Sequence, residues 1–209
     1  MSICRPRLIL ASTSPRRRQL LAQAGYEFEV IAPSNQAECG VCSRESPGEM
    51  VVRLASQKAA DVAARLADRQ RQADFIVACD TVAECQGQML GKPADVKHAA
   101  SMLRLLSGRE HRVYSGLCLW PLPSGQPDVR LARTTLRMDP LSTRQIDEYL
   151  ASGLWQGKAG AFGYQDRVGW LHIAEGSESN VVGLPLELLV EMLAEAAGGR
   201  YQNSAPPTP

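Results

Sequence analysis

The sequence Leu-Ile-Leu-Ala-Ser-Thr-Ser-Pro-Arg-Arg-Arg, residues 8–18, predicts a buried strand that passes directly into a helix. Ser14 is a favourable N-cap, and Pro15 fits the first helical position, where a missing N–H group costs nothing. Gly25 predicts the end of this helix. The arginines Arg16–Arg18 place three cations in the first turn, where the helix dipole repels positive charge. The stretch therefore indicates either a bound anion, with a polyphosphate as the obvious candidate, or an ordinary solvated basic turn.

Length and composition are typical of one globular domain. The chain of 209 residues is 44% hydrophobic, which is enough for a substantial core, and we expect a single domain over residues 1–197. Residues 198–209 are polar and rich in proline, so we expect a disordered tail there. A net charge of +1 and an aromatic content of 5% argue against a nucleic-acid partner, despite the arginines near the N-terminus.

The sequence predicts a cytoplasmic location without a membrane partner. No apolar run is long enough to cross a membrane, and the segment Arg5-Pro6-Arg7 interrupts any signal-peptide core. The six cysteines are then expected to be free thiols. Cys39 and Cys42 have the spacing of half a zinc site, but no second pair of ligands follows at a matching spacing. The sequence does not decide the oligomeric state, and a homodimer stays open.

Strand and helix patterns alternate along the rest of the chain. The predicted strands cover residues 28–31, 75–79, 113–120, 129–138 and 170–173, and residues 82–90 predict a hairpin. Predicted helices begin near Ser46, Asp95, Ser142 and Pro185. This order predicts an α/β fold that has a mixed β-sheet and flanking helices.

Candidate chemical groups gather at the ends of these predicted elements. Asp80 follows the predicted strand 75–79, at a position where a carboxylate can hold a divalent metal or activate water. Lys92 lies in a tight turn, and Lys158 lies among glycines that would let a phosphate approach the backbone. Lys58 falls on the apolar stripe of its helix, where a lysine more often snorkels to the surface than enters a cleft. Each residue alone has a structural explanation, but together they suit the hydrolysis of a phosphoanhydride.

Five separated motifs resemble those of the Maf family. They are Leu10-Ala11-Ser12-Thr13-Ser14-Pro15-Arg16-Arg17, Cys79-Asp80-Thr81-Val82, Gly91-Lys92-Pro93, Lys158-Ala159-Gly160 and Asn180-Val181-Val182-Gly183-Leu184-Pro185-Leu186. The resemblance implies an inosine-triphosphatase-like α/β fold with two lobes around a cleft. It also implies a nucleoside triphosphate as the substrate, hydrolysed to the monophosphate and pyrophosphate, and a divalent cation, Mg²⁺ or Mn²⁺.

The same resemblance implies roles for individual residues. Asp80 matches the family's catalytic acid, which accepts a proton from the attacking water, and Asp80 with Glu38 forms the candidate metal-binding pair. Three matches favour the branch that acts on dTTP and UTP over the branch that acts on 7-methyl-GTP: Arg16, Thr81 and Gln165. The other candidate substrate-binding residues match phosphate-binding positions of the cleft: Ser12, Arg17, Lys58, Lys92 and Lys158.

Two departures from the family pattern qualify these matches. Glu38 is the only acid after the second predicted strand, where the family often has an acidic pair. Tyr164 and Asp166 flank Gln165 where the family often has Gly-Ile-Gln-Gly, so they could alter base selection. The alternative function is a nucleotide-binding regulator of cell division that does not hydrolyse its ligand. Pyrophosphate release distinguishes the two.

Overall fold

One mixed β-sheet organises the described part of the chain, which in this computed structural model excludes residues 1–5, 39–44, 67–72, 124, 197 and 199–209. Its strands are β1 (Arg7–Ala11), β2 (Glu27–Val30), β3 (Phe75–Cys85), β4 (Gln88–Leu90), β5 (Glu110–Pro121), β6 (Asp128–Met138) and β7 (Leu171–Glu175). The strand order is β2-β1-β3-β5-β6-β7, with β4 paired to β3. Because β1 is parallel to β2 and β3 while the other pairs are antiparallel, the predicted mixed sheet is confirmed.

Helices flank this sheet on both faces. They are α1 (Pro15–Gln23), α2 (Pro47–Leu66), α3 (Val96–Leu106), α4 (Thr143–Ala151), α5 (Glu178–Val182) and α6 (Leu186–Ala196), with short 3-10 turns η1 (Asn35–Glu38), η2 (Ala159–Ala161) and η3 (Tyr164–Asp166). The short helix α5 and the turns η1, η2 and η3 were not predicted from the sequence, because their few residues carry no hydrophobic periodicity.

The predicted helix starts are confirmed by their caps. The Ser14 side chain accepts a hydrogen bond from the third residue of α1. Ser46 and Glu49 bond reciprocally at the start of α2, and Ser142 and Gln145 do the same at the start of α4. Each pair satisfies backbone N–H groups that have no partner within the helix.

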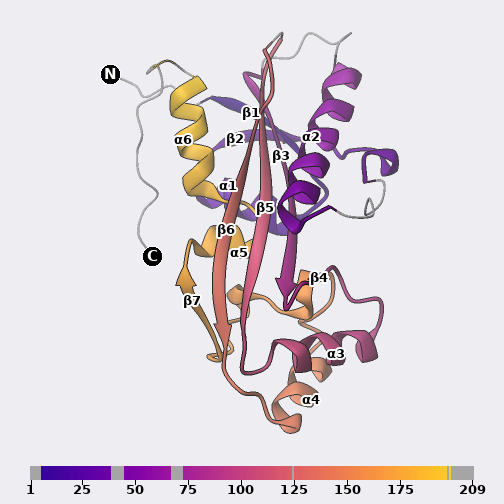
Figure 1. Cartoon of the computed structure of the whole chain (residues 1–209). Helices are drawn as coiled ribbons and strands as arrows, with labels where there is room; N and C mark the ends of the chain where they lie inside the picture. Colours follow the sequence, from indigo (N-terminus) through magenta and orange to yellow (C-terminus); the bar gives the residue numbers. More distant parts are fainter. Residues whose placement is uncertain (1–5, 39–44, 67–72, 124, 197, 199–209) are drawn as a thin grey trace.

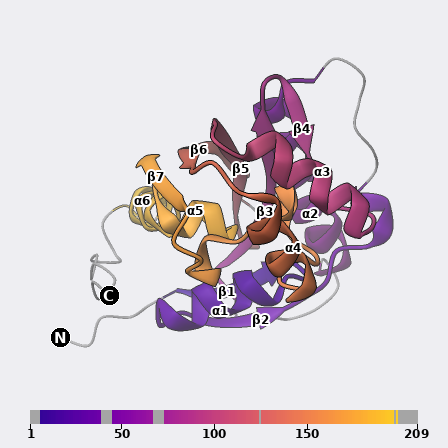
Figure 2. The same ribbon diagram turned by 90° about the horizontal axis from the view of Figure 1, so that it is seen from below.

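Hydrophobic side chains form clusters on both faces of the sheet and at one of its ends. The α2 residues Ala55, Ala59 and Val62 pack on one face, while Leu21 of α1 and Leu189 of α6 pack on the other. A third cluster joins α3 and α4 to the lower ends of the long strands (Figure 1). Figure 2 gives the same arrangement from below. The strands β3 and β5 contribute residues to all three clusters. These two strands therefore connect the three parts of the hydrophobic core.

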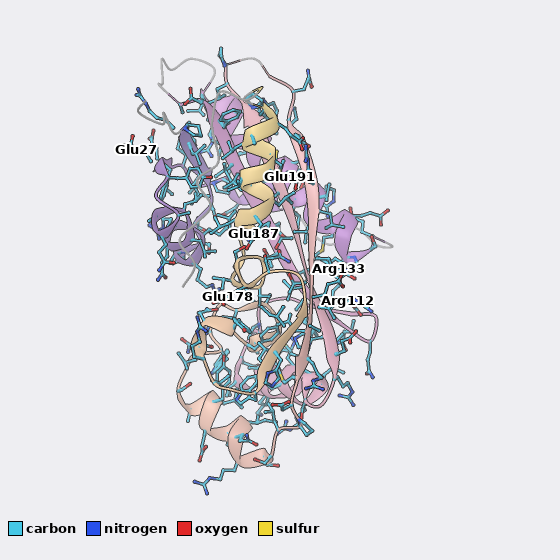
Figure 3. All side chains as sticks on the ribbon, turned by 90° about the vertical axis from the view of Figure 1, so that its left-hand side faces the viewer. Glu27, Arg112, Arg133, Glu178, Glu187 and Glu191 are labelled. Carbon is cyan, nitrogen blue, oxygen red and sulfur yellow. The ribbon has the colours of Figure 1, made fainter. Side chains whose placement is uncertain are left out.

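Charged side chains lie mainly on the outer faces of these elements. Figure 3 shows Glu187 and Glu191 on α6, with Arg112 and Arg133 on the long strands. Arg130 of β6 donates a hydrogen bond to Glu191, 3.1 Å away, which links α6 to the sheet. Because this pair is exposed, it adds little to the free energy of folding.

The strand β3 is longer than the sequence predicted. We expected it to end at Cys79, with Asp80 in a loop, but it continues to Cys85. Its parallel pairing with β1 stops at Ala78, whereas its antiparallel pairing with β5 continues as far as Glu84. Asp80 therefore lies just beyond the end of β1, but within a strand that β5 supports.

Some predictions fall outside the described residues. Cys39 and Cys42 lie there, as does nearly all of the tail predicted over residues 198–209. Within the described residues, three cysteines are buried free thiols: Cys79, Cys85 and Cys118. No helix among the described residues is long and apolar enough to cross a membrane.

Candidate active site

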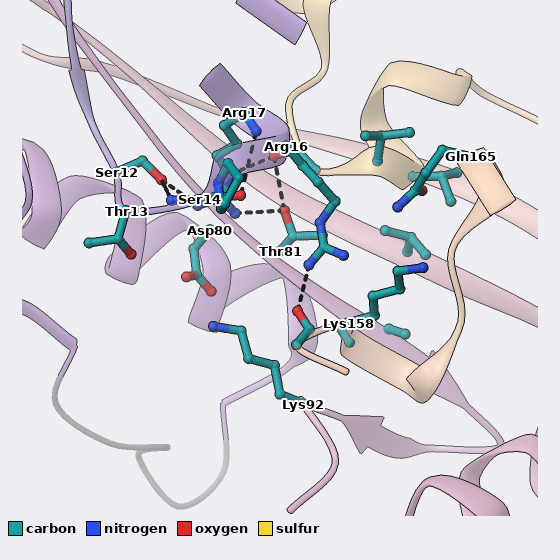
Figure 4. A pocket seen from close by; sticks show the side chains of 18 of the residues that line it. Ser12, Thr13, Ser14, Arg16, Arg17, Asp80, Thr81, Lys92, Lys158 and Gln165 are labelled. Atoms are coloured by element: carbon teal, nitrogen blue, oxygen red, sulfur yellow. Dashed lines mark hydrogen bonds between the residues drawn. The ribbon is translucent and has the colours of Figure 1, made fainter. Parts of the chain in front are cut away.

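A pocket of about 600 Å³ opens beyond the carboxyl end of β1. Its wall is built from the β1–α1 segment, α2, β3, the loop before η2, η3 and the end of α5. Every candidate catalytic or substrate-binding residue predicted from the sequence lines it: Ser12, Arg16, Arg17, Lys58, Asp80, Thr81, Lys92, Lys158 and Gln165. Figure 4 shows these residues apart from Lys58. The volume lies within the range of small-molecule sites in proteins.

Asp80 is held by Lys58 from α2. The Lys58 Nζ atom donates a hydrogen bond to Asp80 Oδ1 over 2.6 Å, and Lys58 is only 5% exposed. Lys58 therefore does not snorkel to the surface, as its position on an apolar stripe suggested. The Asp80 side chain is 17% exposed, and its Oδ2 atom has no hydrogen-bond partner among the described residues. The carboxylate is thus oriented through one oxygen and available to the pocket through the other.

The backbone of α2 lies very close to the backbone of β5 beside Asp80. Gly116 of β5 is the partner of Asp80 in the β3–β5 register. A Cβ atom on Gly116 would lie 2.2 Å from the carbonyl oxygen of Val51 in α2. Glycine is therefore required for the helix backbone to rest directly on the sheet. This contact sets the distance between the sheet and α2, the helix that carries Lys58.

Arg17 is fixed from three sides. Its Nε atom donates to the Gly183 carbonyl oxygen at 2.7 Å, and its two Nη atoms donate to Ser12 Oγ at 3.3 Å and to Thr81 Oγ1 at 3.2 Å. The Thr81 hydroxyl also bonds with Ser115 Oγ, 2.9 Å away. These contacts occupy the Thr81 side chain, so its position favours orienting Arg17 over reading a base.

The helix α5 supplies the carbonyl that holds Arg17. Ser177 caps α5, and the buried Asn180 side chain donates to Thr134 Oγ1 at 2.9 Å, which anchors the helix to β6. The helix ends at Gly183, whose φ of +124° is disfavoured for other residues. The sequence motif around Asn180 marked this segment, but the anchoring role of Ser115 carried no sequence signal.

Three pocket cations have no carboxylate partner among the described residues: Arg16, Arg17 and Lys92. The Arg16 side chain donates to the Gly157 carbonyl oxygen, and burial together with the nearby Arg17 charge lowers its pKa. These cations lie beside the N-terminus of α1, whose dipole adds partial positive charge. The pocket therefore favours an anion with several negative charges.

Lys158 differs from those three cations. It is 7% exposed, and its Nζ atom lies 2.5 Å from each carboxylate oxygen of Asp166. The Tyr149 hydroxyl of α4 donates to Asp166 Oδ2 at 2.7 Å, and burial raises the pKa of Tyr149. The neighbouring Gln165 is exposed to the pocket and makes no hydrogen bond with the described residues.

Few candidate metal ligands lie at the pocket among the described residues. Those residues contain no group of three or more His, Cys, Asp or Glu side chains that could hold a metal ion. Asp80 is the one acidic residue among the described residues that line the pocket. Glu38 closes η1, but its side chain lies outside the described part of the chain. Its metal-binding role stays a prediction.

The fold and the pocket together define an α/β protein with a cationic pocket at the end of its parallel strands. A family model described as "Maf-like protein" matches residues 7–196, and the chain belongs to the Maf family.

Proteins similar to this chain include ones named dTTP/UTP pyrophosphatase. A protein of Rhodopirellula baltica is 56% identical over 187 residues, which cover 89% of this chain and 80% of the relative. A protein of Moorella thermoacetica is 44% identical over 190 residues, which cover 90% of this chain and 94% of the relative. Among solved structures, the Staphylococcus aureus Ham1 protein matches with a TM-score of 0.51 at 13% identity, covering 91% of this chain and 99% of that one. That likeness concerns the fold alone and agrees with the fold class that the sequence predicted.

Proposed function

We propose that this protein hydrolyses nucleoside triphosphates to the monophosphate and pyrophosphate, with dTTP and UTP as its preferred common substrates. The observation that carries the proposal is the Lys58–Asp80 pair, which faces a pocket lined by three cations that have no carboxylate partner in the described part of the chain. A triphosphate supplies the matching negative charge, and a carboxylate with one free oxygen can accept a proton from water. The names of the relatives from R. baltica and M. thermoacetica support the choice of substrate.

In the proposed reaction, water attacks the α-phosphorus and Asp80 takes the proton. The water oxygen forms a new bond to phosphorus, and the bond to the oxygen that bridges the α and β phosphates breaks. Pyrophosphate leaves with that electron pair, and the proton from water passes to Asp80 Oδ2. Lys58 holds Oδ1 at 2.6 Å, so the carboxylate does not rotate away from the attacking water.

Two pocket cations that have no carboxylate partner within the described ranges, Arg17 and Lys92, stabilise the departing pyrophosphate. Negative charge grows on the leaving group as the bond breaks, and Arg17 and Lys92 can neutralise it there. Arg17 is already oriented by Gly183, Ser12 and Thr81, so little reorganisation is needed. Positioning and electrostatics supply most of the acceleration in phosphoryl transfer.

A divalent cation, Mg²⁺ or Mn²⁺, fits this site only with help from the substrate. One carboxylate combined with substrate phosphates is a common way for proteins to bind Mg²⁺. Asp80 would hold the cation together with triphosphate oxygens, and Glu38 is the second candidate ligand. When bound, the cation would neutralise phosphate charge and polarise a phosphoryl oxygen.

A panel of nucleoside triphosphates assayed for pyrophosphate tests the proposed activity. We expect pyrophosphate and the monophosphate as products, with the highest kcat/KM for UTP and dTTP. Release of inorganic phosphate alone would contradict the proposed bond cleavage. Tight nucleotide binding without any product would favour the non-hydrolysing regulator instead.

Gln165 is the residue that we expect to recognise the pyrimidine base. Its amide can donate and accept at once, which matches the donor–acceptor edge of uracil and thymine. Gln165→Ala should lower kcat/KM for UTP by the equivalent of about 1–3 kcal/mol, the effect of one or two lost hydrogen bonds. The loss for GTP should be much smaller. Steady-state kinetics on both substrates measures this, and an equal loss would show that Gln165 is structural.

A further inference from the structure

The pocket carries two ion pairs, which divide it into chemically different ends. Lys58 pairs with Asp80 at one end, and Lys158 pairs with Asp166 at the other. Figure 4 shows Lys158 and Gln165 on the opposite side from Ser12 and Asp80. The cations Arg17 and Lys92, which have no carboxylate partner among the described residues, lie toward the Asp80 end (Figure 4).

Asp166 cancels the charge of Lys158. Both carboxylate oxygens contact the ammonium, and the side chains of Lys158 and Asp166 are 9% and 5% exposed. At such burial the pair is weakly screened by water, so a phosphate brought to Lys158 would meet the repulsion of the carboxylate. An uncharged ring meets no such repulsion.

The polar ends of Asp166, Lys158 and Gln165 all lie around Gly163. A Cβ atom on Gly163 would lie 2.7 Å from Lys158 Nζ, 2.9 Å from Asp166 Oδ2 and 2.9 Å from Gln165 Nε2. The three side-chain ends therefore converge on the one residue that has no side chain. The Tyr149 hydroxyl fixes the carboxylate from behind, so the cluster is anchored to α4.

We propose that Asp166 is a positioning residue for base recognition, which acts by neutralising Lys158 and by limiting the space that the Gln165 amide can occupy beside Gly163. This inference rests on the proposed function and deepens it. Asp166 does not line the pocket and acts through Lys158 and Gln165. The end of the pocket beside Gln165 then takes an uncharged pyrimidine ring, and the triphosphate lies toward Asp80.

The primary test replaces Asp166 by Asn and compares two ligands. UTP has a base, whereas inorganic triphosphate has none and is used as a competitive inhibitor. For Asp166→Asn, we expect the KM for UTP to rise about tenfold, because the base end of the pocket then carries the Lys158 charge, with kcat within about threefold of the wild-type value. The Ki of inorganic triphosphate should stay unchanged or fall, because the freed Lys158 charge attracts phosphate.

A matched control removes a carboxylate from the outer face of the same region. Glu148 of α4 pairs with Arg144 at 2.8 Å, and both side chains are mostly exposed. Glu148→Gln should change neither the KM for UTP nor the Ki of inorganic triphosphate. Any shared effect of Glu148→Gln and Asp166→Asn would trace to net charge and would overturn the proposal.

Two further variants keep the proposal testable if Asp166→Asn does not fold. Tyr149→Phe removes only the hydroxyl that fixes Asp166, and Gly163→Ala places a methyl group 2.7–2.9 Å from the side-chain ends of Lys158, Asp166 and Gln165. Both should raise the KM for UTP more than the Ki of inorganic triphosphate. An equal rise in both constants, or no rise in KM, overturns the proposal for either variant.

The experiments distinguish a failure of the proposed function from a failure of the proposed role of Asp166. If the wild-type protein releases no pyrophosphate from any nucleoside triphosphate, the proposed function is wrong and the comparison of Asp166 variants does not apply. If the wild type is active on UTP and Asp166→Asn keeps the wild-type KM, only the role of Asp166 is wrong.

Discussion

At the scale of single residues, the chemistry of the pocket depends on how each polar atom is engaged. Asp80 and Thr81 are adjacent in β3, but their side chains have different partners. Asp80 uses one oxygen for Lys58 and keeps the other available, whereas the Thr81 hydroxyl contacts both Arg17 and Ser115. The first is placed to react with water, and the second is placed to orient a cation.

Asp80→Asn should abolish pyrophosphate release while nucleotide binding persists. The amide keeps the shape of the carboxylate and can still accept from Lys58, but it cannot take a proton from water. We expect kcat to fall on the order of 10²–10⁴-fold. Single-turnover assays and equilibrium binding of UTP measure the two properties. The control is Asp128→Asn, which changes an exposed carboxylate that pairs with Arg130. If the Asp80→Asn variant turned over within a few-fold of the wild-type rate, Asp80 would have no catalytic role.

Thr81→Val should slow the hydrolysis of all bases alike. It keeps the shape of the side chain but removes a hydroxyl that accepts from the Arg17 guanidinium. A hydrogen bond to a charged group contributes about 1.5–3 kcal/mol, so kcat/KM should fall for UTP and GTP by similar factors. Ser115→Ala should give a smaller loss of the same kind. A loss confined to UTP would instead place Thr81 in contact with the base.

At the scale of secondary-structure elements, the site depends on how closely α2 rests on β5. Gly116 lies opposite Asp80 in the sheet and directly under the α2 backbone. The same helix carries Lys58, so the height of α2 above the sheet decides whether Lys58 reaches Asp80. One glycine therefore links helix packing to the orientation of the candidate base.

Gly116→Ala should lower both stability and turnover. The new methyl group would lie 2.2 Å from the Val51 carbonyl oxygen, so α2 must move away from β5. Such overpacking destabilises a protein by about 1–3 kcal/mol, and the shift should also weaken the Lys58–Asp80 contact. Urea unfolding and kcat, measured where the variant is folded, report the two effects. Gly91→Ala, with no atom within 4 Å of its Cβ position, should change neither value.

At the scale of the whole molecule, a buried histidine makes the stability of the fold sensitive to pH. His111 of β5 is 2% exposed, and neither ring nitrogen has a hydrogen-bond partner among the described residues. Its ring meets Phe162 edge-on, with the ring centroids 5.1 Å apart. Burial lowers the pKa of His111 from 6.5 to about 4. The neutral ring is therefore the form that the folded protein accommodates.

The free energy of unfolding should fall as the pH decreases from about 6.5 toward 4. In that window the unfolded chain binds a proton at His111 and the folded protein does not, so acid favours unfolding. The full effect is on the order of 3 kcal/mol, and it is absent above pH 7. Urea titrations at several pH values measure it. His111→Phe should flatten the curve relative to wild type, and an unchanged curve would contradict the assignment.

Local sequence patterns predicted the longer helices and the strands of this fold, although not the end of β3. Hydrophobic periodicity and capping residues such as Ser14 and Ser142 act over a few positions, so they predicted helix starts that the structure confirms. Five motifs also indicated the family, and the resemblance to it indicated the residues that the pocket gathers, including Lys58 and Gln165, which lie outside those motifs. Local patterns could not place the end of β3, because pairing with β5 extends that strand past Asp80.

Only the tertiary structure decided how those residues are paired. Lys58 and Asp80 are 22 positions apart, and Arg17 and Gly183 are 166 positions apart, so no local pattern joins them. Lys158 shows the consequence. Its position among glycines suggested a free phosphate-binding cation, but the folding of η3 brings Asp166 into contact with its ammonium. The sequence says which side chains can be charged. Whether that charge is available to a ligand depends on which neighbours folding brings within contact distance.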